Sequence, residues 1–361
     1  MSGPERALAR IDLGAIERNC RRLRSLTAPT TELCAVVKAD AYGHGAAQAA
    51  EAALRGGASW LAVAAAAEAT DLRAHGVGAR ILVMGALTRD ELREALDADA
   101  DVVAWTAEFA GAARTPGRPR VHVKLDTGMG RLGTKDAELA RSLLGADVAG
   151  VMTHFATADE PGDDLFPAQL ERFARFLEGV RGQAPGAVVH AANSAATFRD
   201  PASHFDMVRC GVAVYGLDPF QGDPAERALE PALTFESWVA ALRRFDAGDS
   251  AGYGRTWSAE RPTWVATVPV GYGDGWRRGL SNGSDVLIRG RRYPVVGTIS
   301  MDNVTVDLGP RPEAQVGDRA TLIGAQGSER LLAEELARTL GTINYEVTCG
   351  LTDRVPRRYD E

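Results

Sequence analysis

The residues best suited to chemistry in this sequence follow short apolar runs. Lys38 follows LCAVV, Lys124 lies in RVHVKLD, His154 follows GVMT, Asn193 and Ser194 follow VVHAA, and Arg209 lies in DMVR. If these runs are parallel strands, their carboxyl ends meet on one face, so we expect the side chains to converge there. A single lysine at a strand end usually reaches out to solvent. Five converging strand ends make that explanation insufficient.

Lys38 is the strongest candidate nucleophile. It lies in AVVKADAYGHG, where an apolar run leads straight into a turn that contains Tyr42. The chain has only three lysines, Lys38, Lys124 and Lys135, and all its other basic residues are arginines. Burial at the mouth of a barrel lowers the pKa of a lysine. The free amine then attacks an aldehyde and forms a Schiff base.

The elements that position these residues alternate along the first two thirds of the chain. The expected strands are Leu33–Val37, Trp60–Ala64, Arg80–Met84, Asp101–Ala104, Arg120–Leu125, Val148–Thr153, Val188–Ala191 and Met207–Cys210. Amphipathic helical patterns separate them, among them 14–24, 46–55, 89–96, 137–144 and 165–180. Eight strand–helix units predict an α/β fold, a (β/α)8 barrel. A doubly wound parallel sheet is the alternative, and periodicity alone does not exclude it.

The pattern changes near Glu230. The expected strands are then Thr234–Leu242, Trp264–Val270, Asp285–Ile288, Tyr293–Val296, Thr298–Val306 and Arg319–Ile323, with one helix at about 331–340. Such runs, punctuated by Gly and Pro, predict a second, mainly antiparallel β domain. We therefore expect a barrel over residues 12–230 and a β domain over 231–361. A short strand at 7–11 could join either of them.

Length and composition limit the classes of function. At roughly 150 residues per domain, 361 residues suggest about two domains. A net charge of −7 without a basic cluster argues against nucleic acid as a partner. No stretch approaches the ~18–20 uncharged apolar residues of a membrane span, and the first residues lack a secretory signal. The four cysteines are scattered, which favours a reducing cytoplasm and neither a zinc site nor disulfides.

The run around Lys38 resembles the pyridoxal-phosphate lysine motif of alanine racemases. The resemblance continues through KLDTGMGRLG (124–133), THFATAD (153–159), HAANSAA (190–196), VRCGVAVYG (208–216), AGYGRTW (251–257), GYGDG (271–275), VGTISMDN (296–303) and INYEV (343–347). These blocks keep the family's order and cover nearly the whole chain. The family fold, a barrel followed by a β domain, agrees with the pattern described above. The resemblance implies pyridoxal 5'-phosphate as cofactor.

The resemblance also implies how the proton is transferred. Lys38 would hold the cofactor as a Schiff base and then act as acid and base on one face of the substrate's Cα. Tyr253 would act on the other face, reaching in from the second subunit of a homodimer. Racemisation needs an acid/base on each side of a planar carbanion, so one lysine and one tyrosine suffice.

The remaining roles follow from the same resemblance. Arg209 would face the pyridine nitrogen and keep it unprotonated, because an arginine keeps its own proton; this restrains side reactions. His154 would position Arg209 and the ring. The phosphate would bind Tyr42, Ser194 and the amides of Gly211 and Val212, with Asn193 also in the cofactor site. The substrate carboxylate would bind Arg131, helped by Met301, Asp302 and Lys124, which family members often carry in carbamylated form.

Two positions depart from the family pattern. Asp353, in CGLTDRVPRRY, takes the place of a tyrosine that donates a hydrogen bond to the phosphate and narrows the pocket. An ionised aspartate cannot donate, and it repels a phosphate. Asp353 turns away, binds Arg354 or a water, or is protonated. In each case the pocket gains room and a polar wall, so serine or a larger amino acid becomes conceivable as the substrate. Ser300 replaces a common cysteine, with little expected effect.

Four readings remain after the sequence is considered. The first is an alanine racemase, a cytoplasmic enzyme that supplies D-alanine for peptidoglycan. The second is a racemase of serine or another amino acid with the same mechanism. The third is a pyridoxal-phosphate decarboxylase. Such enzymes characteristically have a Gly-rich phosphate loop and a catalytic cysteine in the second domain, but this sequence has neither a Gly-Gly-Gly run nor a cysteine in GTISMDN. The fourth, a non-catalytic carrier of the cofactor, is a shorter barrel without the second domain or a counterpart of Tyr253.

Overall fold

The computed structural model describes residues 5–114, 120–180 and 182–361. They form two compact units, one of residues 16–220 and one of residues 1–15 with 221–361. Among the described residues, no helix is long and apolar enough to cross a membrane.

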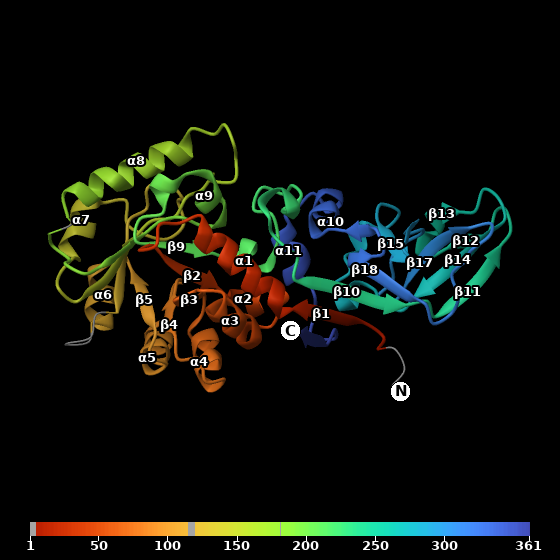
Figure 1. Ribbon diagram of the computed structural model, residues 1–361, viewed down its shortest axis with the longest axis horizontal. Helices are drawn as coiled ribbons and strands as arrows, with labels where there is room; N and C mark the ends of the chain where they lie inside the picture. The colour runs from red at the N-terminus through yellow and green to blue at the C-terminus, as the bar shows by residue number, and fades with distance from the viewer. Residues whose placement is uncertain (1–4, 115–119, 181) are drawn as a thin grey trace. The chain divides into compact units, whose positions relative to one another are not determined.

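The unit of residues 16–220 is a closed barrel of eight parallel strands (Figure 1). Its strands are β2 (Glu32–Val36), β3 (Trp60–Val63), β4 (Arg80–Val83), β5 (Asp101–Ala104), β6 (Val121–Lys124), β7 (Val148–Met152), β8 (Val188–His190) and β9 (Met207–Cys210). The barrel closes where β2 pairs with β9, with Cys34 opposite Arg209. The eight strands predicted from the apolar runs are therefore confirmed, each within about two residues at its ends.

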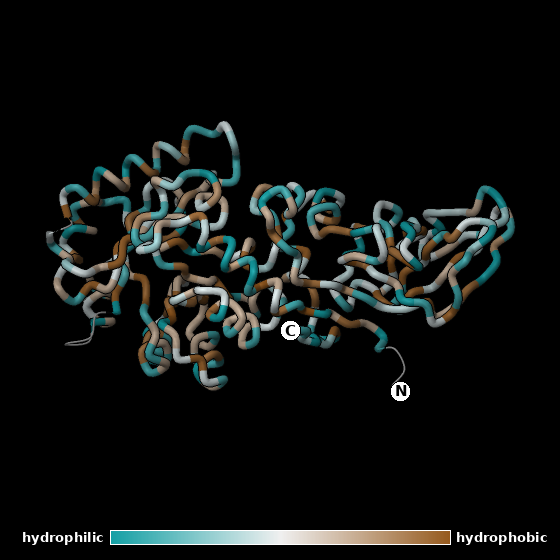
Figure 2. Tube along the Cα trace, viewed as in Figure 1, coloured by the Kyte–Doolittle hydropathy of each residue, from teal (hydrophilic) through white to brown (hydrophobic). Residues whose placement is uncertain are grey.

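Helices follow the strands around the barrel. They are α1 (Leu13–Ser25), α2 (Lys38–Gly43), α3 (Ala46–Arg55), α4 (Ala66–Ala74), α5 (Arg89–Asp97), α6 (Ala107–Ala113), α7 (Ala137–Ser142), α8 (Leu165–Glu178) and α9 (Ser194–Arg199). Several begin at a side-chain cap, as where the Thr88 hydroxyl accepts a hydrogen bond from the amide of Glu91 at the start of α5. Figure 2 shows that apolar residues concentrate in the strands, while the loops are mostly hydrophilic.

The other unit contains three sheets. The largest has the order β16-β15-β18-β10-β1-β20, with β19 paired to β18; the others are β11-β14-β17 and β12-β13. The bounds are β1 (Leu8–Asp12), β10 (Leu233–Trp238), β11 (Ala241–Phe245), β12 (Ser250–Ala251), β13 (Trp257–Ser258), β14 (Thr263–Val268), β15 (Asp285–Ile288), β16 (Arg291–Pro294), β17 (Val304–Gly309), β18 (Arg319–Gln326), β19 (Glu329–Leu331) and β20 (Arg357–Asp360). All pairs are antiparallel except β1 with β20. The expected second, mainly antiparallel β domain is confirmed.

Three details differ from the sequence-based prediction. The run 234–242 is two strands, because Val239 and Ala240 carry the chain from the largest sheet to the three-stranded one. Only Val304–Val306 of the run 298–306 is strand. The carbonyls of Ser300 and Met301 instead accept hydrogen bonds from a turn at Tyr272 and Gly273. The third difference is an added helix: α10 (Ala333–Leu340) is followed by α11 (Asn344–Cys349). The buried Asn344 amide, which donates to Glu334, anchors this short helix.

Candidate active site

Lys38 lies where β2 ends and a strained turn begins. The next four residues, Ala39 to Tyr42, all have φ between 51° and 56°, the left-handed region. This region costs roughly 1–2 kcal/mol per non-glycine residue, so other contacts must hold the turn in place. The Glu68 carboxylate accepts hydrogen bonds from the amides of Ala39 (2.6 Å), Ala64 (2.7 Å) and Ala65 (3.0 Å). Glu68 thus ties the residue after Lys38 to the start of α4.

Aromatic packing supports the far end of the same turn. The ring of His44 stacks on Tyr215 with centroids 4.6 Å apart, and the ring of Tyr42 lies 5.2 Å from the same tyrosine. The Tyr215 hydroxyl donates to the carbonyl of Val36 in β2. The direction in which Lys38 leaves the strand is therefore fixed from both sides.

Tyr42, Ser194 and Gly211, which follow β2, β8 and β9 respectively, form a polar cradle. The Ser194 hydroxyl accepts hydrogen bonds from the amides of Gly211 (3.0 Å) and Ala213 (3.4 Å). A Cβ on residue 211 would lie 2.3 Å from the Tyr42 hydroxyl oxygen, so a larger residue there would displace Tyr42. Hydroxyls and backbone amides after a late barrel strand suit a phosphate group. Val212 is buried beside them.

Asn193 has a structural use in this arrangement. Its side-chain oxygen accepts the amide of Ala196 at 2.9 Å and so caps α9. This cap holds Ser194, the first residue of the helix, in the cradle.

Arg209 is a fully buried guanidinium at the end of β9. It donates to His190 Nδ1 (2.9 Å), to His154 Nδ1 (3.1 Å) and to the carbonyls of Thr153 and Ala191. Among the described residues no carboxylate lies within ion-pair distance of it. Burial lowers the pKa of Arg209 to about 10, which leaves it a cation at neutral pH.

His154 faces this cation and is neutral. Burial, reinforced by Arg209, holds its pKa well below the ordinary value. Its Nδ1 accepts from Arg209, so its proton is on Nε2.

Lys124 ends β6, and Arg131 lies within the loop that follows it. Lys124 is 4 % exposed, and burial, followed by Arg209 and Arg131, lowers its pKa to about 8. Arg131 is exposed. At pH 8 a large fraction of the Lys124 amine is therefore uncharged, because burial and the neighbouring cations both disfavour the charged form.

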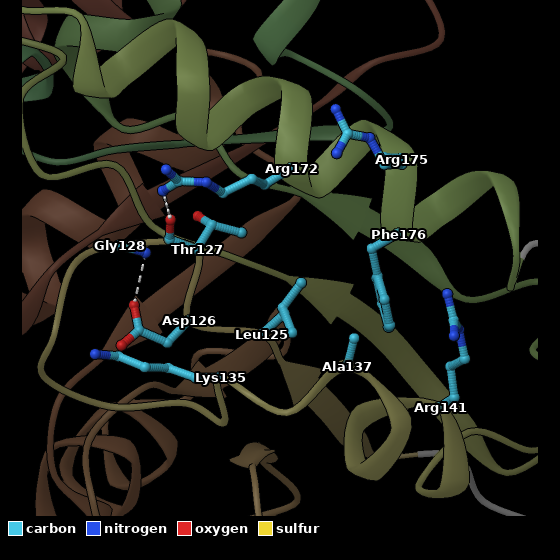
Figure 3. A pocket seen from close by; sticks show the side chains of 10 residues that line it. All are labelled: Leu125, Asp126, Thr127, Gly128, Lys135, Ala137, Arg141, Arg172, Arg175 and Phe176. Atoms are coloured by element: carbon cyan, nitrogen blue, oxygen red, sulfur yellow. Dashed lines mark hydrogen bonds between the residues drawn. The ribbon is translucent and has the colours of Figure 1, made fainter.

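The loop between them is held by Asp126. One of its carboxylate oxygens accepts the amides of Gly128 (3.0 Å), Met129 (2.8 Å) and Gly130 (3.2 Å). Burial raises the pKa of Asp126, but these three donors outweigh it and keep the pKa below the ordinary value. Arg172 of α8 donates a hydrogen bond to the carbonyl of Thr127 (Figure 3). Both residues line a pocket of about 450 Å³.

The remaining predicted residues gather in the other unit. Tyr253 (73 % exposed) and Met301 (51 % exposed) stand on neighbouring segments, because Gly252 pairs with Thr298. Asp302 receives a hydrogen bond from Arg354 at 2.6 Å. Asp353 is exposed in a turn, and its carboxylate has no hydrogen-bond or ion-pair partner in the part of the chain that the structure describes. Arg354 therefore pairs with Asp302 and Asp274, and not with Asp353.

Sequence reasoning missed Glu68 and the histidines His122 and His190. Glu68 acts through backbone amides, which leave no motif. His122 had a detectable signal, since it lies two residues before Lys124 in a strand and so shares its face. His190 lay in a recognised block without receiving a role.

These features define a class of protein, the barrel enzymes that hold an aldehyde cofactor with a phosphate at the ends of their strands. A lysine that ends a strand, and a cradle of hydroxyls and backbone amides in which a Cβ at position 211 would press on Tyr42, fit pyridoxal 5'-phosphate in particular.

Comparison with known proteins places the chain in one family. The alanine racemase N-terminal domain matches residues 11–219, and the alanine racemase C-terminal domain matches residues 232–359. The chain therefore belongs to the alanine racemase family, whose members are amino acid racemases that use pyridoxal 5'-phosphate.

Individual relatives agree over nearly the whole length. The alanine racemase of Symbiobacterium thermophilum is 44 % identical, covering 99 % of this chain and 98 % of its own; that of Geobacillus stearothermophilus is 41 % identical, covering 97 % and 92 %. The crystal structure of alanine racemase from E. faecalis has a TM-score of 0.91 at 37 % identity, covering 98 % of each chain. That of alanine racemase from Streptomyces lavendulae has a TM-score of 0.91 at 39 % identity, covering 100 % and 98 %.

Replacing Glu68 by Gln tests whether its bond to Ala39 holds Lys38. A neutral amide accepts more weakly, so we expect the free energy of unfolding to fall by roughly 1–3 kcal/mol and kcat to fall several-fold. Glu91→Gln is the matched control, because Glu91 occupies the same position in α5 without contacting the Lys38 turn. Chemical denaturation and steady-state kinetics provide the readouts. Equal kcat in the two variants would contradict the role of Glu68.

Proposed function

We propose that this chain interconverts L- and D-alanine by two-base proton transfer. The single observation that carries the proposal is the convergence of Lys38, the Tyr42–Ser194–Gly211 cradle and Arg209 at the ends of neighbouring barrel strands. Bound there, pyridoxal 5'-phosphate acidifies the Cα–H of an attached amino acid through its conjugated ring.

The residues of this chain divide the remaining work. The Lys38 Nζ holds or moves the proton on one face of Cα, and the hydroxyl of Tyr253 of the partner subunit does so on the other. Arg131 binds the substrate carboxylate, and Met301 and Asp302 are further proposed contacts of that carboxylate. Arg209, positioned by His154, stays protonated and so leaves the ring nitrogen unprotonated.

A homodimer follows from the need for an opposing base. Tyr253 and Met301 are large side chains that their own unit leaves mostly exposed, which supports a partner-facing role. We further propose a cytoplasmic enzyme that supplies D-alanine for peptidoglycan, because the relatives are alanine racemases and the four cysteines are scattered along the sequence.

Mixing two inactive variants tests the shared site. Lys38→Ala and Tyr253→Phe each lack one base, but a hybrid dimer of the two contains one intact pair. Co-refolding equal amounts with the cofactor should restore about a quarter of wild-type activity, because about half of the dimers are hybrids with one working site of two. Tyr253→Phe alone should bind cofactor normally and lose deuterium exchange from one enantiomer. Normal racemisation by Tyr253→Phe, or mixtures without activity, would contradict the assignment.

Lys124 is a candidate for carbamylation. Its neutral amine adds to CO2, forming an N–C bond and releasing a proton, and the new carboxylate then pairs with Arg131. Because the pKa of Lys124 is about 8, the modification should increase as the pH rises through 8 and decline below it. ¹³C NMR with labelled bicarbonate should show one carbamate signal that Lys124→Ala removes and the exposed control Lys135→Ala keeps. A signal that survives Lys124→Ala would disprove the site, and an unchanged KM for alanine in that variant would disprove its role.

Serine is the second candidate substrate, and Asp353 is the observation that favours it. An unpartnered carboxylate in the place of a tyrosine leaves room for a hydroxyl. We expect alanine to retain the higher kcat/KM and Asp353→Tyr to raise the alanine-to-serine ratio by roughly tenfold. Asp360→Tyr, an exposed position in the same unit, is the control. A ratio that Asp353→Tyr leaves within about twofold of wild type would exclude Asp353 from specificity.

A further inference from the structure

A continuous line of polar side chains crosses the interior of the barrel. Arg209 Nη1 lies 2.9 Å from His190 Nδ1, His190 Nε2 lies 2.7 Å from His122 Nδ1, and His122 Nε2 lies 3.1 Å from Asp101 Oδ2. The two histidines and Asp101 are at most 1 % exposed. The line starts at the first residue of β5 and ends near the carboxyl end of β9, where the candidate active site lies.

The chemistry of the two ends determines the direction of every hydrogen bond between them. A guanidinium can only donate, so His190 Nδ1 must accept and its proton is on Nε2. His190 Nε2–H then donates to His122 Nδ1, which places the proton of His122 on Nε2. That proton is donated to Asp101, whose carboxylate can only accept. All three bonds therefore run from Arg209 towards Asp101.

This direction requires both histidines to be neutral. Burial, reinforced by Arg209, holds the pKa of His190 well below its ordinary value. Burial also lowers the pKa of His122, more than the bond to Asp101 raises it. A proton added to either ring would replace an acceptor by a donor and break the line.

The Asp101 end is anchored by arginines. Arg80 lies 2.9 Å and Arg120 3.5 Å from its carboxylate oxygens. The Arg80 guanidinium also stacks 4.2 Å above the Trp60 ring, and the edge of that ring packs against His122. The acceptor at this end is thus held in place independently of the active site.

We propose that Asp101, His122 and His190 form a one-way hydrogen-bond relay that orients Arg209 and stabilises its positive charge. Asp101 is then a positioning residue for racemisation, although it lies at the opposite end of the barrel from Lys38. A buried carboxylate that fixes the tautomer of an imidazole is an established catalytic device; here two imidazoles extend its reach to a guanidinium. The consequence for catalysis rests on the proposed role of Arg209 beside the cofactor ring.

Other titratable groups also face Arg209 and enter any measurement of pH dependence. They are His154 after β7, Lys124 on β6, Cys34 on β2 and Cys210 on β9. Burial raises the pKa of both cysteines, that of Cys210 to about 12, so neither is charged at neutral pH. Among the residues that the structure describes, only His190 and His154 bond directly to the guanidinium through a side chain.

The tautomers are tested on the unaltered protein loaded with pyridoxal 5'-phosphate and labelled with ¹⁵N-histidine. Long-range ¹H–¹⁵N correlation spectra, assigned with His→Gln variants, distinguish Nδ1–H, Nε2–H and doubly protonated rings. We expect His122 and His190 to be neutral Nε2–H tautomers at pH 7. A proton on Nδ1 of either ring at that pH would overturn the relay.

Asp101→Asn tests the catalytic consequence with little change in shape. Arg120 keeps Asp99 as its partner and Arg80 is partly exposed, so we expect the variant to fold. An asparagine oxygen is a neutral and weaker acceptor, so the chemical shifts of the His122 and His190 rings should change, while Arg209 still fixes both rings as Nε2–H tautomers. We expect kcat to fall roughly tenfold with little change in KM, and the alkaline limb of the pH profile to move down by roughly one unit as Arg209 loses support.

His204→Gln is the matched control, because His204 is a buried histidine of the same unit whose ring bonds only to the Thr197 carbonyl among the described residues. It should leave the other histidine spectra and the pH profile unchanged. If Asp101→Asn lowers only the melting temperature, with spectra, kcat and pH profile as in the wild type, Asp101 is merely a structural ion-pair partner and the proposal fails. The proposed role of Arg209 fails on a different result, an unchanged cofactor absorption spectrum in Arg209→Gln.

Discussion

The structure of the barrel unit depends on burying the Arg209 guanidinium, which has no carboxylate within ion-pair distance among the described residues. A buried charge is costly unless hydrogen bonds satisfy it. Arg209 is satisfied by two carbonyls and two imidazoles, and its nearest anion along the hydrogen bonds is Asp101, three bonds away. A direct carboxylate partner would compete for the guanidinium N–H groups. Distributed neutral acceptors keep the cation ordered and leave its charge available to a ligand.

The same unit stores strain next to its nucleophile. Four residues in the left-handed region follow Lys38, and they persist because Glu68, Tyr215 and the start of α3 hold them from several directions. The loop that carries Arg131 is built in a comparable way, with one Asp126 oxygen accepting three successive amides. In both places a carboxylate accepts hydrogen bonds from backbone amides and so fixes the segment that presents a basic side chain.

Much of this could be predicted from sequence, for identifiable reasons. The eight barrel strands are buried on both faces, so they read as short continuous apolar runs. The run 234–242 was wrongly predicted to be one strand, because the residues that connect the two sheets are as apolar as the strands on either side. The relay could not be predicted from the sequence, because His122 and His190 are 68 positions apart and come together only when the barrel has formed. The sequence does not distinguish whether Asn193 is a cofactor ligand or a helix cap, because the start of α9 is known only from the structure.

The protonation state of the cofactor's ring nitrogen tests the central claim most directly. Protein loaded with pyridoxal 5'-phosphate that carries ¹⁵N in its ring reports that state through the nitrogen chemical shift. With a cationic Arg209 facing it, the nitrogen should remain unprotonated from pH 6 to 9, and Arg209→Glu should shift it towards the protonated form. A protonated ring nitrogen in the wild-type protein at pH 7 would contradict the account, because the buried cation would then not face the ring.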